Sequence, residues 1–415
     1  MTNDWARAAF IGGLRSMTGG TVRLQLDGTI QEFGTGPGLS ASLNVHDHRF
    51  FRRALTAADI GIGESYMDGD WTSTDLVALG RLMLRNRAIV ESRSGLQSTM
   101  LRWIAAAARR LRNNSLTGSR RNIRRHYDLG NDFFRLFLDA NLLMYSSAYF
   151  SDPADSLEQA QFQKVERVAR LLDLKPGDHV LEIGTGWGGF ALWAASTYGC
   201  RVTTTTISDR QYEYACAWRE RAGDAGRRVE VLRADYRNLT GRFDKIVSIE
   251  MFEAVGLDHY DEYFGAADRL LTDDGTMFIQ TITVTDQWFP KYHGQPDWIE
   301  KHIFPGGELA SIGEIAKSLS RATNLSIHAA ENFGLHYART LHEWRRRFLA
   351  RLDDVRRLGF DDRFIRMWEF YLAICEAAFL ERHTGVYQLL LAKNGVARPL
   401  FNDAWARTDR ELLAG

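Results

Sequence analysis

The hydrophobic pattern changes along the chain and separates a short N-terminal part from a longer C-terminal part. Residues 21–26, TVRLQL, alternate apolar and polar positions, which predicts a half-buried strand. Residues 74–85, TDLVALGRLMLR, carry apolar positions at helical spacing, so a helix is expected there. We therefore expect roughly the first 85 residues to form a small unit of their own.

From residue 173 onward, short apolar runs alternate with amphipathic segments. We predict strands in HVLEIG (179–184), RVTTTTIS (201–208), VEVLRAD (229–235), DKIVSIEMF (244–252) and TMFIQTITV (276–284). Helices are predicted between them, including residues 209–223 and 260–271. This alternation is typical of the α/β class, with a doubly wound, mainly parallel sheet covered by helices on both faces. Ligands of such sheets bind beyond the carboxyl ends of the strands.

The alternation stops after the last of these strands. Residues 286–308 are too long for a plain connection, and we expect an insertion that caps the site. Two helical runs follow, each with one apolar face: Leu341, Trp344, Phe348 and Leu352 in the first, and Phe364, Met367, Tyr371 and Ile374 in the second. Such faces are usually core, although a groove for a long hydrocarbon would show the same spacing.

Charge and cysteine content narrow the function. Lys plus Arg and Asp plus Glu both number 52, so no nucleic-acid partner is expected. Residues 92–127 nevertheless hold nine arginines and no acidic residue, which suits either a solvated linker or an anionic partner. Three widely spaced cysteines suggest neither a disulfide framework nor a metal site and favour the cytoplasm. Without a secretion signal or an apolar run of about 20 residues, we expect any membrane contact to be peripheral.

A glycine turn follows the first predicted strand of the larger part. Gly184, Gly186 and Gly189 match G-x-G-x-x-G, a pattern that dinucleotide-binding enzymes share. Those enzymes place an acidic residue about 20 positions further on, where this chain has TTTTIS. Glu182 stands inside the strand instead, where its carboxylate suits the cationic part of S-adenosylmethionine. We expect Asp235 to accept a hydrogen bond from the adenine amino group, the alternative being a cap on the next turn.

Longer segments resemble one family in order and spacing. These are NIRRHYDLGNDFFRLFLDANLLMYSSAYF (122–150), SIEMFEAVG (248–256), WIEKHIFPGGELASI (298–312), ENFGLHYARTLHEWRRRF (331–348) and, near the N-terminus, GIGESYMDGDW (61–71). Together they resemble the cyclopropane-fatty-acyl-phospholipid synthases over nearly the whole chain. The resemblance implies that S-adenosylmethionine contacts Tyr145, Ser146, Gly184, Gly186, Thr206, Gln211, Asp235 and Tyr236. Glu182 and Gly188 are expected to contact it as well.

The resemblance also implies a reaction. A methyl group is transferred to a cis double bond of a phospholipid acyl chain, and a base then removes a proton from the resulting carbocation. In the family the base is a bound bicarbonate, and the positions that would hold it here are Ser147, Glu253, Gln280, Ile282 and Tyr337. Ser147 stands in place of a cysteine and Gln280 in place of a histidine. Because glutamine cannot carry a positive charge, it holds an anion less well.

Glu250 is an extra carboxylate three residues before Glu253. The two can share one pocket, where paired carboxylates push their pKa values apart so that one serves as base. The alternative is that Glu250 only caps the following helix. Relatives with S-I-E-M in place of a glycine form include enzymes that make methyl-branched or methylene fatty acids, so a cyclopropane and a methyl-branched product both stay open. Tyr337 is expected in the site, the alternative being a buried tyrosine with a satisfied hydroxyl.

The expected organisation is an N-terminal lipid-binding or association domain (1–100), a basic linker (101–125) and a methyltransferase domain with acyl-chain-binding insertions (126–415). The expected partners are an unsaturated phospholipid, an anionic membrane surface and a second copy of the chain. The sequence leaves three other functions open: N-methylation of a small molecule, dehydrogenation beside a methyl branch, and lipid binding without catalysis. His126, His302, Trp298 and Trp344 are expected to be structural.

Overall fold

The computed structural model describes residues 4–87, 129–295 and 297–396. The chain divides into two compact units that interleave along the sequence. Unit 1 takes the described residues of 1–112, 291–305 and 338–384, and unit 2 takes the remainder. This division differs from the three consecutive segments expected above, because parts of the insertion and of the C-terminal helices belong to unit 1. The basic stretch 92–127, and His126 within it, lie outside the described residues.

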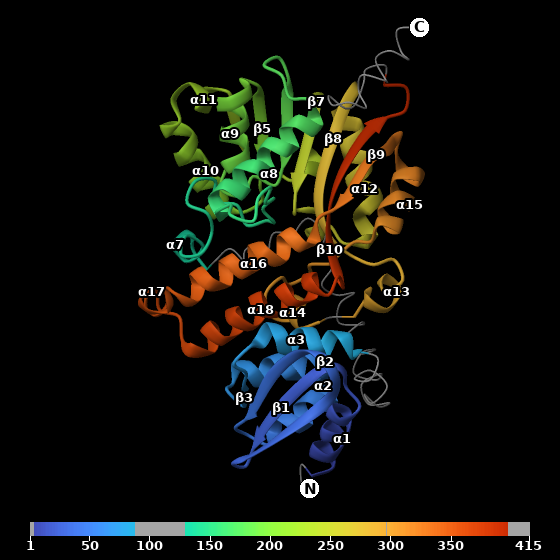
Figure 1. Ribbon diagram of the computed structural model, residues 1–415. Coiled ribbons are helices and arrows are strands. Elements are labelled where there is room, and N and C mark those ends of the chain that lie inside the picture. Colours follow the sequence, from blue (N-terminus) through green and yellow to red (C-terminus); the bar gives the residue numbers. More distant parts are fainter. Residues whose placement is uncertain (1–3, 88–128, 296, 397–415) are drawn as a thin grey trace. The chain divides into compact units, whose positions relative to one another are not determined.

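Unit 2 is built on a seven-stranded sheet in the order β6-β5-β4-β7-β8-β10-β9 (Figure 1). Its strands are β4 (His179–Ile183), β5 (Arg201–Thr205), β6 (Val229–Leu232), β7 (Phe243–Ile249), β8 (Leu271–Val284), β9 (Leu325–Asn332) and β10 (Thr384–Lys393). The first five pair in parallel, whereas β9 and β10 pair antiparallel. The predicted doubly wound α/β class and all five predicted strands are confirmed, and β9 and β10 were not predicted.

Helices cover both faces of this sheet (Figure 1). Alternate residues of β4 explain why: Leu181 and Ile183 belong to one buried core, and Val180 belongs to the other. Each core is completed by apolar side chains of the helices on its own side. The helices of unit 2 are α7 (Asn131–Phe134), α8 (Leu157–Leu172), α9 (Gly189–Tyr198), α10 (Asp209–Arg221), α11 (Gly223–Arg227), α12 (Tyr260–Leu270), α13 (Phe289–Tyr292, up to Pro290) and α15 (Ile312–Ala322). Three 3₁₀ turns accompany them, η1 (Tyr236–Asn238), η2 (Phe252–Ala254) and η3 (Leu257–His259).

Local sequence signals set where these helices begin. Ser156 and Gln159 form a reciprocal capping box at the start of α8. Ser208 caps α10 and Ser311 caps α15, each accepting a backbone N–H three residues on. Because the five parallel strands run in one direction, their carboxyl ends meet at one edge of the sheet, where the glycine turn and the 250–253 segment also lie.

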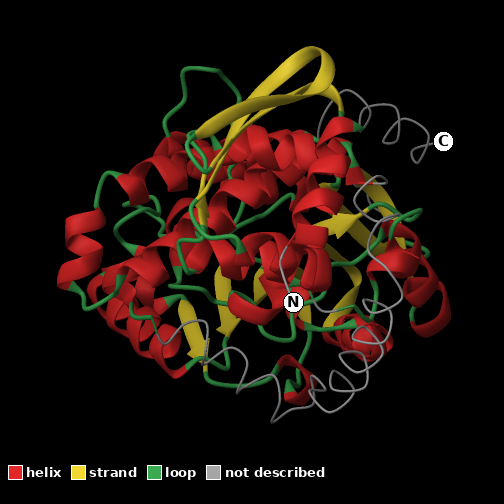
Figure 2. Cartoon of the chain, turned by 90° about the horizontal axis from the view of Figure 1, so that it is seen from below, coloured by secondary structure: helices red, strands yellow, loops and turns green. Residues whose placement is uncertain are grey.

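Unit 1 contains a three-stranded antiparallel sheet and several helices. Its strands are β1 (Thr18–Leu26), β2 (Thr29–Val45) and β3 (Trp71–Thr72), and β1 and β2 form the long hairpin that Figure 2 draws as a curved yellow ribbon. Its helices are α1 (Asp4–Arg15), α2 (Arg49–Met67), α3 (Leu76–Arg85), α14 (Trp298–His302), α16 (Gly334–Leu349, from Ala338 on), α17 (Leu352–Arg357) and α18 (Asp362–Leu380). The predicted strand at 21–26 and helix at 74–85 are confirmed.

The two predicted apolar faces are buried to different extents. Leu341, Trp344 and Phe348 are buried along α16, but a break before Leu352 starts the new helix α17. On α18 only Tyr371 of the predicted face is buried, and Phe364, Met367 and Ile374 stay partly exposed. The fully enclosed positions of α18 include Ile365, Trp368 and Leu372 instead. None of the described helices combines the length and apolar character that a bilayer crossing requires.

The histidine and tryptophans of the insertion and α16 also lie in unit 1. Trp298 and Trp344 are buried packing residues, as expected. His302, for which no partner was evident in the sequence, lies 3.1 Å from a carboxylate oxygen of Glu64. The insertion itself contains α13 and α14, and its capping role stays a prediction.

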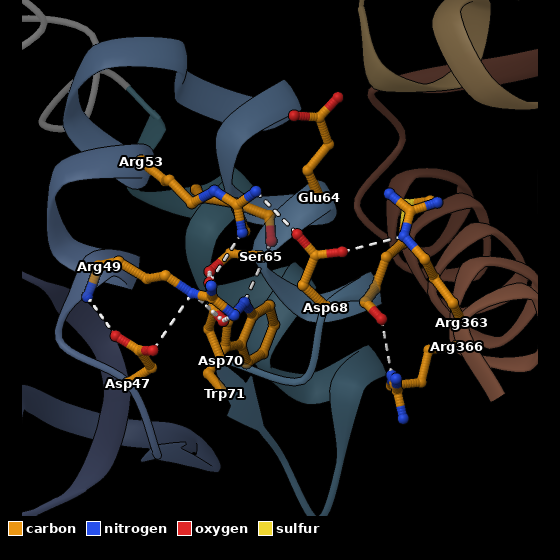
Figure 3. Close-up of polar contacts among 12 residues, drawn as sticks. Asp47, Arg49, Arg53, Glu64, Ser65, Asp68, Asp70, Trp71, Arg363 and Arg366 are labelled. Atoms are coloured by element: carbon orange, nitrogen blue, oxygen red, sulfur yellow. Dashed lines mark hydrogen bonds and ion pairs between the residues drawn. The ribbon is translucent and has the colours of Figure 1, made fainter.

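A buried carboxylate organises the N-terminal part of unit 1 (Figure 3). The side chain of Asp70 has no solvent exposure and accepts hydrogen bonds from Arg49 Nε (2.6 Å), Arg53 (2.8 Å) and Ser65 Oγ (2.7 Å). These contacts tie both ends of α2 to the turn before β3. Buried carboxylates persist only with such partners, because an unpaired charge is costly to bury.

We expect Asp70→Ala to destabilise the protein by about 1–3 kcal/mol. This is less than the ~3–5 kcal/mol for a fully buried ion pair, because Arg49 and Arg53 are 51% and 29% exposed and can be rehydrated. Urea unfolding measures the change. Arg7→Ala, which breaks an exposed pair with Asp27, is the control and should change stability by less than about 0.5 kcal/mol. Equal effects of the two variants would contradict the role given to Asp70.

Candidate active site

The glycine turn between β4 and α9 takes backbone conformations that side chains resist. Gly184, Gly186 and Gly188 have φ values of +103°, +53° and +94°. The N–H groups of Gly184 and Thr185 donate to the carbonyl of Thr205, which ties the turn to the end of β5. A Cβ atom built on Gly186 would meet no atom within 4 Å. The turn is therefore firmly held on one side and open on the other.

The segment that follows α7, residues 139–148, packs against the start of α9. A Cβ on Gly189 would lie 2.1 Å from the carbonyl oxygen of Leu142, so only glycine permits this approach. Buried Asp139 holds the segment by accepting the N–H groups of residues 142–144 at 2.6–3.1 Å. The ring of Tyr145 lies 5.3 Å from Phe134, which in turn lies 5.2 Å from Trp187 in the turn. Tyr145 and its neighbour Ser146 are thus brought beside the glycine turn.

Glu182 is a buried carboxyl at the end of β4. Its Oε2 accepts a hydrogen bond of 2.5 Å from Thr204 Oγ1 on β5. Burial raises the pKa of Glu182 to about 8, although the bond from Thr204 opposes the shift. A cation bound in the turn would lower this pKa again. The position therefore suits the sulfonium and ammonium groups of S-adenosylmethionine.

The expected ribose and adenine residues follow β5 and β6. The Thr206 hydroxyl donates to Gln211 Oε1 at 2.9 Å, and both side chains are buried. Asp235 accepts the backbone N–H of Arg237 at the start of η1, so the capping alternative is confirmed. Both of its oxygens also pair with the Arg237 guanidinium at 2.8 and 2.7 Å. Contact of Asp235 and of partly buried Tyr236 with adenine stays a prediction.

Glu250 is the centre of the second half of the site. Its Oε1 accepts the backbone N–H of Ser147 and the Nε2 of Gln280, both at 2.8 Å. Its Oε2 accepts the hydroxyl of Tyr337 at 2.9 Å. Glu250 does not cap the following turn, because η2 starts at Phe252 with no side-chain cap, so that alternative is wrong. Tyr337 is buried with a satisfied hydroxyl, but its partner is this site carboxylate.

Glu253 lies one turn further on and is held less completely. Its Oε1 accepts the backbone N–H of Ile282 at 2.5 Å and the hydroxyl of Thr281 at 3.0 Å. Its Oε2 is buried and has no hydrogen-bond partner among the described residues. Burial, together with the nearby charge of Glu250, raises the pKa of Glu253 to about 8.

A line of side chains orients the amide of Gln280. Arg167 Nε donates to Gln388 Oε1 at 2.6 Å, and Gln388 Nε2 donates to Gln280 Oε1 at 3.0 Å. The remaining amide group of Gln280 must then present its N–H donors, which reach Glu250 and the carbonyl of Ser147. Arg167 and Gln388 were not predicted, because their role depends on where α8 and β10 meet.

Lys164 is a further residue that the sequence interpretation missed. It is fully buried, and its ammonium donates to Ser146 Oγ at 2.7 Å. Burial lowers its pKa to about 8, while the charges of Glu250 and Asp139 oppose this change. A signal was available, since Gln161 and Lys164 lie on the same helical stripe as the buried apolar residues Leu157 and Val168 of α8.

The hydrogen-bond donors around the two carboxyl groups determine where the negative charge of the cluster lies. Burial raises the pKa of Glu250, but the donors Gln280, Ser147 and Tyr337 and the charge of Lys164 oppose the shift. Burial and the Glu250 charge raise the pKa of Tyr337 well above its ordinary value, so the hydroxyl stays protonated and donates. Three donors bond Glu250 and two bond Glu253. The negative charge of the pair therefore resides on Glu250, and Glu253 is largely protonated near neutral pH.

The six predicted catalytic residues therefore meet in one place, directly beside the glycine turn. A Cβ on Gly184 would lie 3.0 Å from the side chain of Met251, which separates Glu250 from the η2 turn. The bicarbonate implied by the resemblance does not fit this arrangement. The backbone N–H of Ser147, the amide of Gln280 and the hydroxyl of Tyr337 already bond Glu250, and the N–H of Ile282 bonds Glu253. The Ser147 hydroxyl donates to the carbonyl of Ala148 instead. No group of acidic, histidine or cysteine side chains suited to a metal ion occurs within the described ranges.

This combination of a parallel sheet, an open glycine turn and a buried strand-end carboxyl defines a class I methyltransferase that uses S-adenosylmethionine. Comparison with known proteins places the chain more narrowly. Residues 114–389 match the family model of mycolic acid cyclopropane synthetase, and the chain belongs to this family.

Relatives and solved structures agree with this assignment. The chain is 39% identical to the tuberculostearic acid methyltransferase UfaA1 of Mycobacterium tuberculosis over 81% of this chain and 79% of that protein. It is 38% identical to the cyclopropane-fatty-acyl-phospholipid synthase of Escherichia coli K12, over 85% and 88%. The mycolic acid cyclopropane synthase CmaA1, solved with SAH and CTAB, is 31% identical with a TM-score of 0.61, covering 66% of this chain and 98% of that chain.

The close approach of Leu142 to Gly189 gives a test of the cofactor half of the site. We expect Gly189→Ala to weaken S-adenosylmethionine binding by about tenfold or more, roughly 1.4 kcal/mol, because the new Cβ displaces the 139–148 segment. Calorimetric titration measures the dissociation constant. Gly177→Ala is the matched control, since a Cβ there meets no atom within 4 Å. Equal affinities of the two variants would contradict the placement of Tyr145 and Ser146 in the site.

Proposed function

We propose that the protein transfers a methyl group from S-adenosylmethionine to the cis double bond of an unsaturated acyl chain in a membrane phospholipid. The product is a cyclopropane or a methyl-branched chain. The observation that carries this proposal is the partly buried carboxyl pair, Glu250 and Glu253, directly beside the glycine turn. A carbon nucleophile as weak as an alkene yields a cation, and a cation needs a nearby base and exclusion of water.

The residues of the chain divide this work between them. When bound, S-adenosylmethionine supplies an electrophilic methyl group. The glycine turn, Glu182 and the 139–148 segment hold and orient the donor, so that positioning contributes much of the catalysis. The negative charge on the carboxyl pair stabilises positive charge that develops nearby. The buried tyrosine and glutamine donors keep that charge in one place.

The names of the relatives support a lipid substrate. Relatives that align over most of this chain are a tuberculostearic acid methyltransferase and a phospholipid cyclopropane synthase. A coclaurine N-methyltransferase has a similar structure, but at 22% identity the likeness concerns the fold alone. An acyl chain therefore has more support than a small amine.

Product analysis tests the proposal directly. Incubated with S-adenosylmethionine and a phospholipid that carries one cis double bond per chain, the purified protein should add one CH₂ unit to the lipid, as measured by mass spectrometry. NMR then distinguishes a cyclopropane ring from a branch. The same lipid with saturated chains is the control and should stay unchanged. Methylation of an added amine, with no change to the lipid, would contradict the proposal.

The membrane part of the proposal rests on charge. Residues 92–127 carry nine arginines and no acidic residue, which favours contact with anionic headgroups at the inner face of the cytoplasmic membrane. We further propose that the N-terminal residues contribute lipid binding or self-association.

Vesicle sedimentation measures this interaction. The protein should sediment with vesicles of anionic phospholipid, at about 1 kcal/mol of binding energy per arginine near the surface, and should be released as salt rises. Vesicles of neutral phospholipid serve as the control. Binding that is equal on both vesicles, or unaffected by salt, would contradict an electrostatic attachment.

A further inference from the structure

The Glu250 carboxylate accepts hydrogen bonds from donors that could otherwise bind a free anion. Three donors from separate parts of unit 2 converge on it, namely the N–H of Ser147, the amide of Gln280 and the hydroxyl of Tyr337, at 2.8, 2.8 and 2.9 Å. The backbone N–H of Glu250 also donates to the carbonyl of Gln280 at 2.7 Å, which fixes the side chain relative to β8. A free oxyanion in this site would compete with Glu250 for the same donors.

The backbone at this position is unusual. Glu250 has a φ of +51°, a left-handed conformation that a glycine adopts without strain and other residues rarely adopt. Strained positions of this kind persist where the surrounding structure over-determines them, often at functional sites. Here the strain directs the carboxylate inward, toward the three donors. A glycine at 250 would keep the backbone and leave the donors unpaired.

The neighbouring carboxyl completes the arrangement. Glu253 Oε2 is buried without a partner among the described residues, while its Oε1 is held by Ile282 and Thr281. Glu250 Oε2 accepts one described hydrogen bond, from Tyr337, so a second lone pair of this oxygen is available. An ionised carboxylate with a free lone pair, next to the methyl-donor turn, has the attributes of a general base.

We propose that Glu250 is the catalytic base of this protein and takes the place of a bound bicarbonate, so that the enzyme works without added anion. This inference rests on the proposed function, since it concerns the same methyl transfer. Tyr337, Gln280 and Ser147 are then positioning residues for a carboxylate that belongs to the chain. Gln388 and Arg167 act one step further away, by orienting the Gln280 amide.

The proton and electron balance is simple. The π electron pair of the double bond forms the new carbon–methyl bond, the pair of the broken methyl–sulfur bond stays on sulfur, and a cation remains on the acyl chain. Glu250 then accepts a proton either from the newly added methyl group or from a chain carbon next to the cationic centre. The electron pair of the broken C–H bond closes the cyclopropane ring or forms a new double bond in a methyl-branched chain. No oxidant or reductant is consumed.

The test compares wild-type protein with Glu250→Gly and Glu250→Gln in buffer depleted of bicarbonate, with transfer of labelled methyl to an unsaturated phospholipid as the readout. Wild type should keep its rate, within about twofold, when bicarbonate is removed. Both variants should lose roughly 10²- to 10⁴-fold. Added bicarbonate or formate should restore Glu250→Gly, whose freed donors can hold an anion, but not Glu250→Gln, whose amide still fills the site.

Controls separate catalysis from folding and from the wider proposal. Asp173→Gly also replaces an acidic residue at a left-handed position, at the end of α8, and should keep the wild-type rate. Unchanged S-adenosylmethionine affinity shows that the Glu250 variants remain folded. A wild-type enzyme that requires bicarbonate, or a Glu250→Gly enzyme that is fully active without it, would overturn the inference. Failure of wild type to methylate any unsaturated lipid would instead overturn the proposed function.

Discussion

The arrangement of the active site depends on the cost of burying one negative charge. A carboxylate removed from water is tolerated only if donors replace its hydration, and Glu250 has three. Those donors come from a loop, a strand and a helix, so the charge cannot be satisfied until these elements are assembled. The structure of unit 2 around the carboxyl ends of β7 and β8 is therefore coupled to the ionisation of one side chain.

Hydrogen bonds around this charge fix the orientation of more distant side chains. Gln280 can only donate to Glu250 because Gln388 occupies its oxygen, and Gln388 has this orientation because Arg167 occupies the oxygen of Gln388. On another side, the buried ammonium of Lys164 binds Ser146, next to the Ser147 N–H that reaches Glu250. The positive charges of Arg167 and Lys164 thus lie on two sides of the Glu250 carboxylate, with one or two side chains between. Because neither charge contacts the carboxylate directly, part of it stays available to accept a proton.

Most of the fold was predictable because its signals are local. Five apolar runs gave the parallel strands, and their common direction places the glycine turn and the 250–253 segment at one edge. The proximity of Glu250 and Glu253 followed from their spacing. The antiparallel strands β9 and β10 were missed because they lie far apart in sequence and flank the long helices. The orientation of Glu250, the role of Gln388 and the burial of Lys164 depend on tertiary packing and on one positive φ, which no local pattern encodes.

The two carboxyl groups also differ in what they can do to a cation. If both were ionised they would repel each other at short range, so burial and proximity leave one charge between them. Burial raises the pKa of both carboxyl groups, and the single proton belongs on Glu253 because fewer donors stabilise its ionised form. A protonated Glu253 cannot accept a second proton on its neutral carboxyl, whereas an ionised Glu250 can accept one and become neutral. The difference in the number of donors lets the site hold one negative charge away from water. It therefore also selects which of the two residues acts as the base.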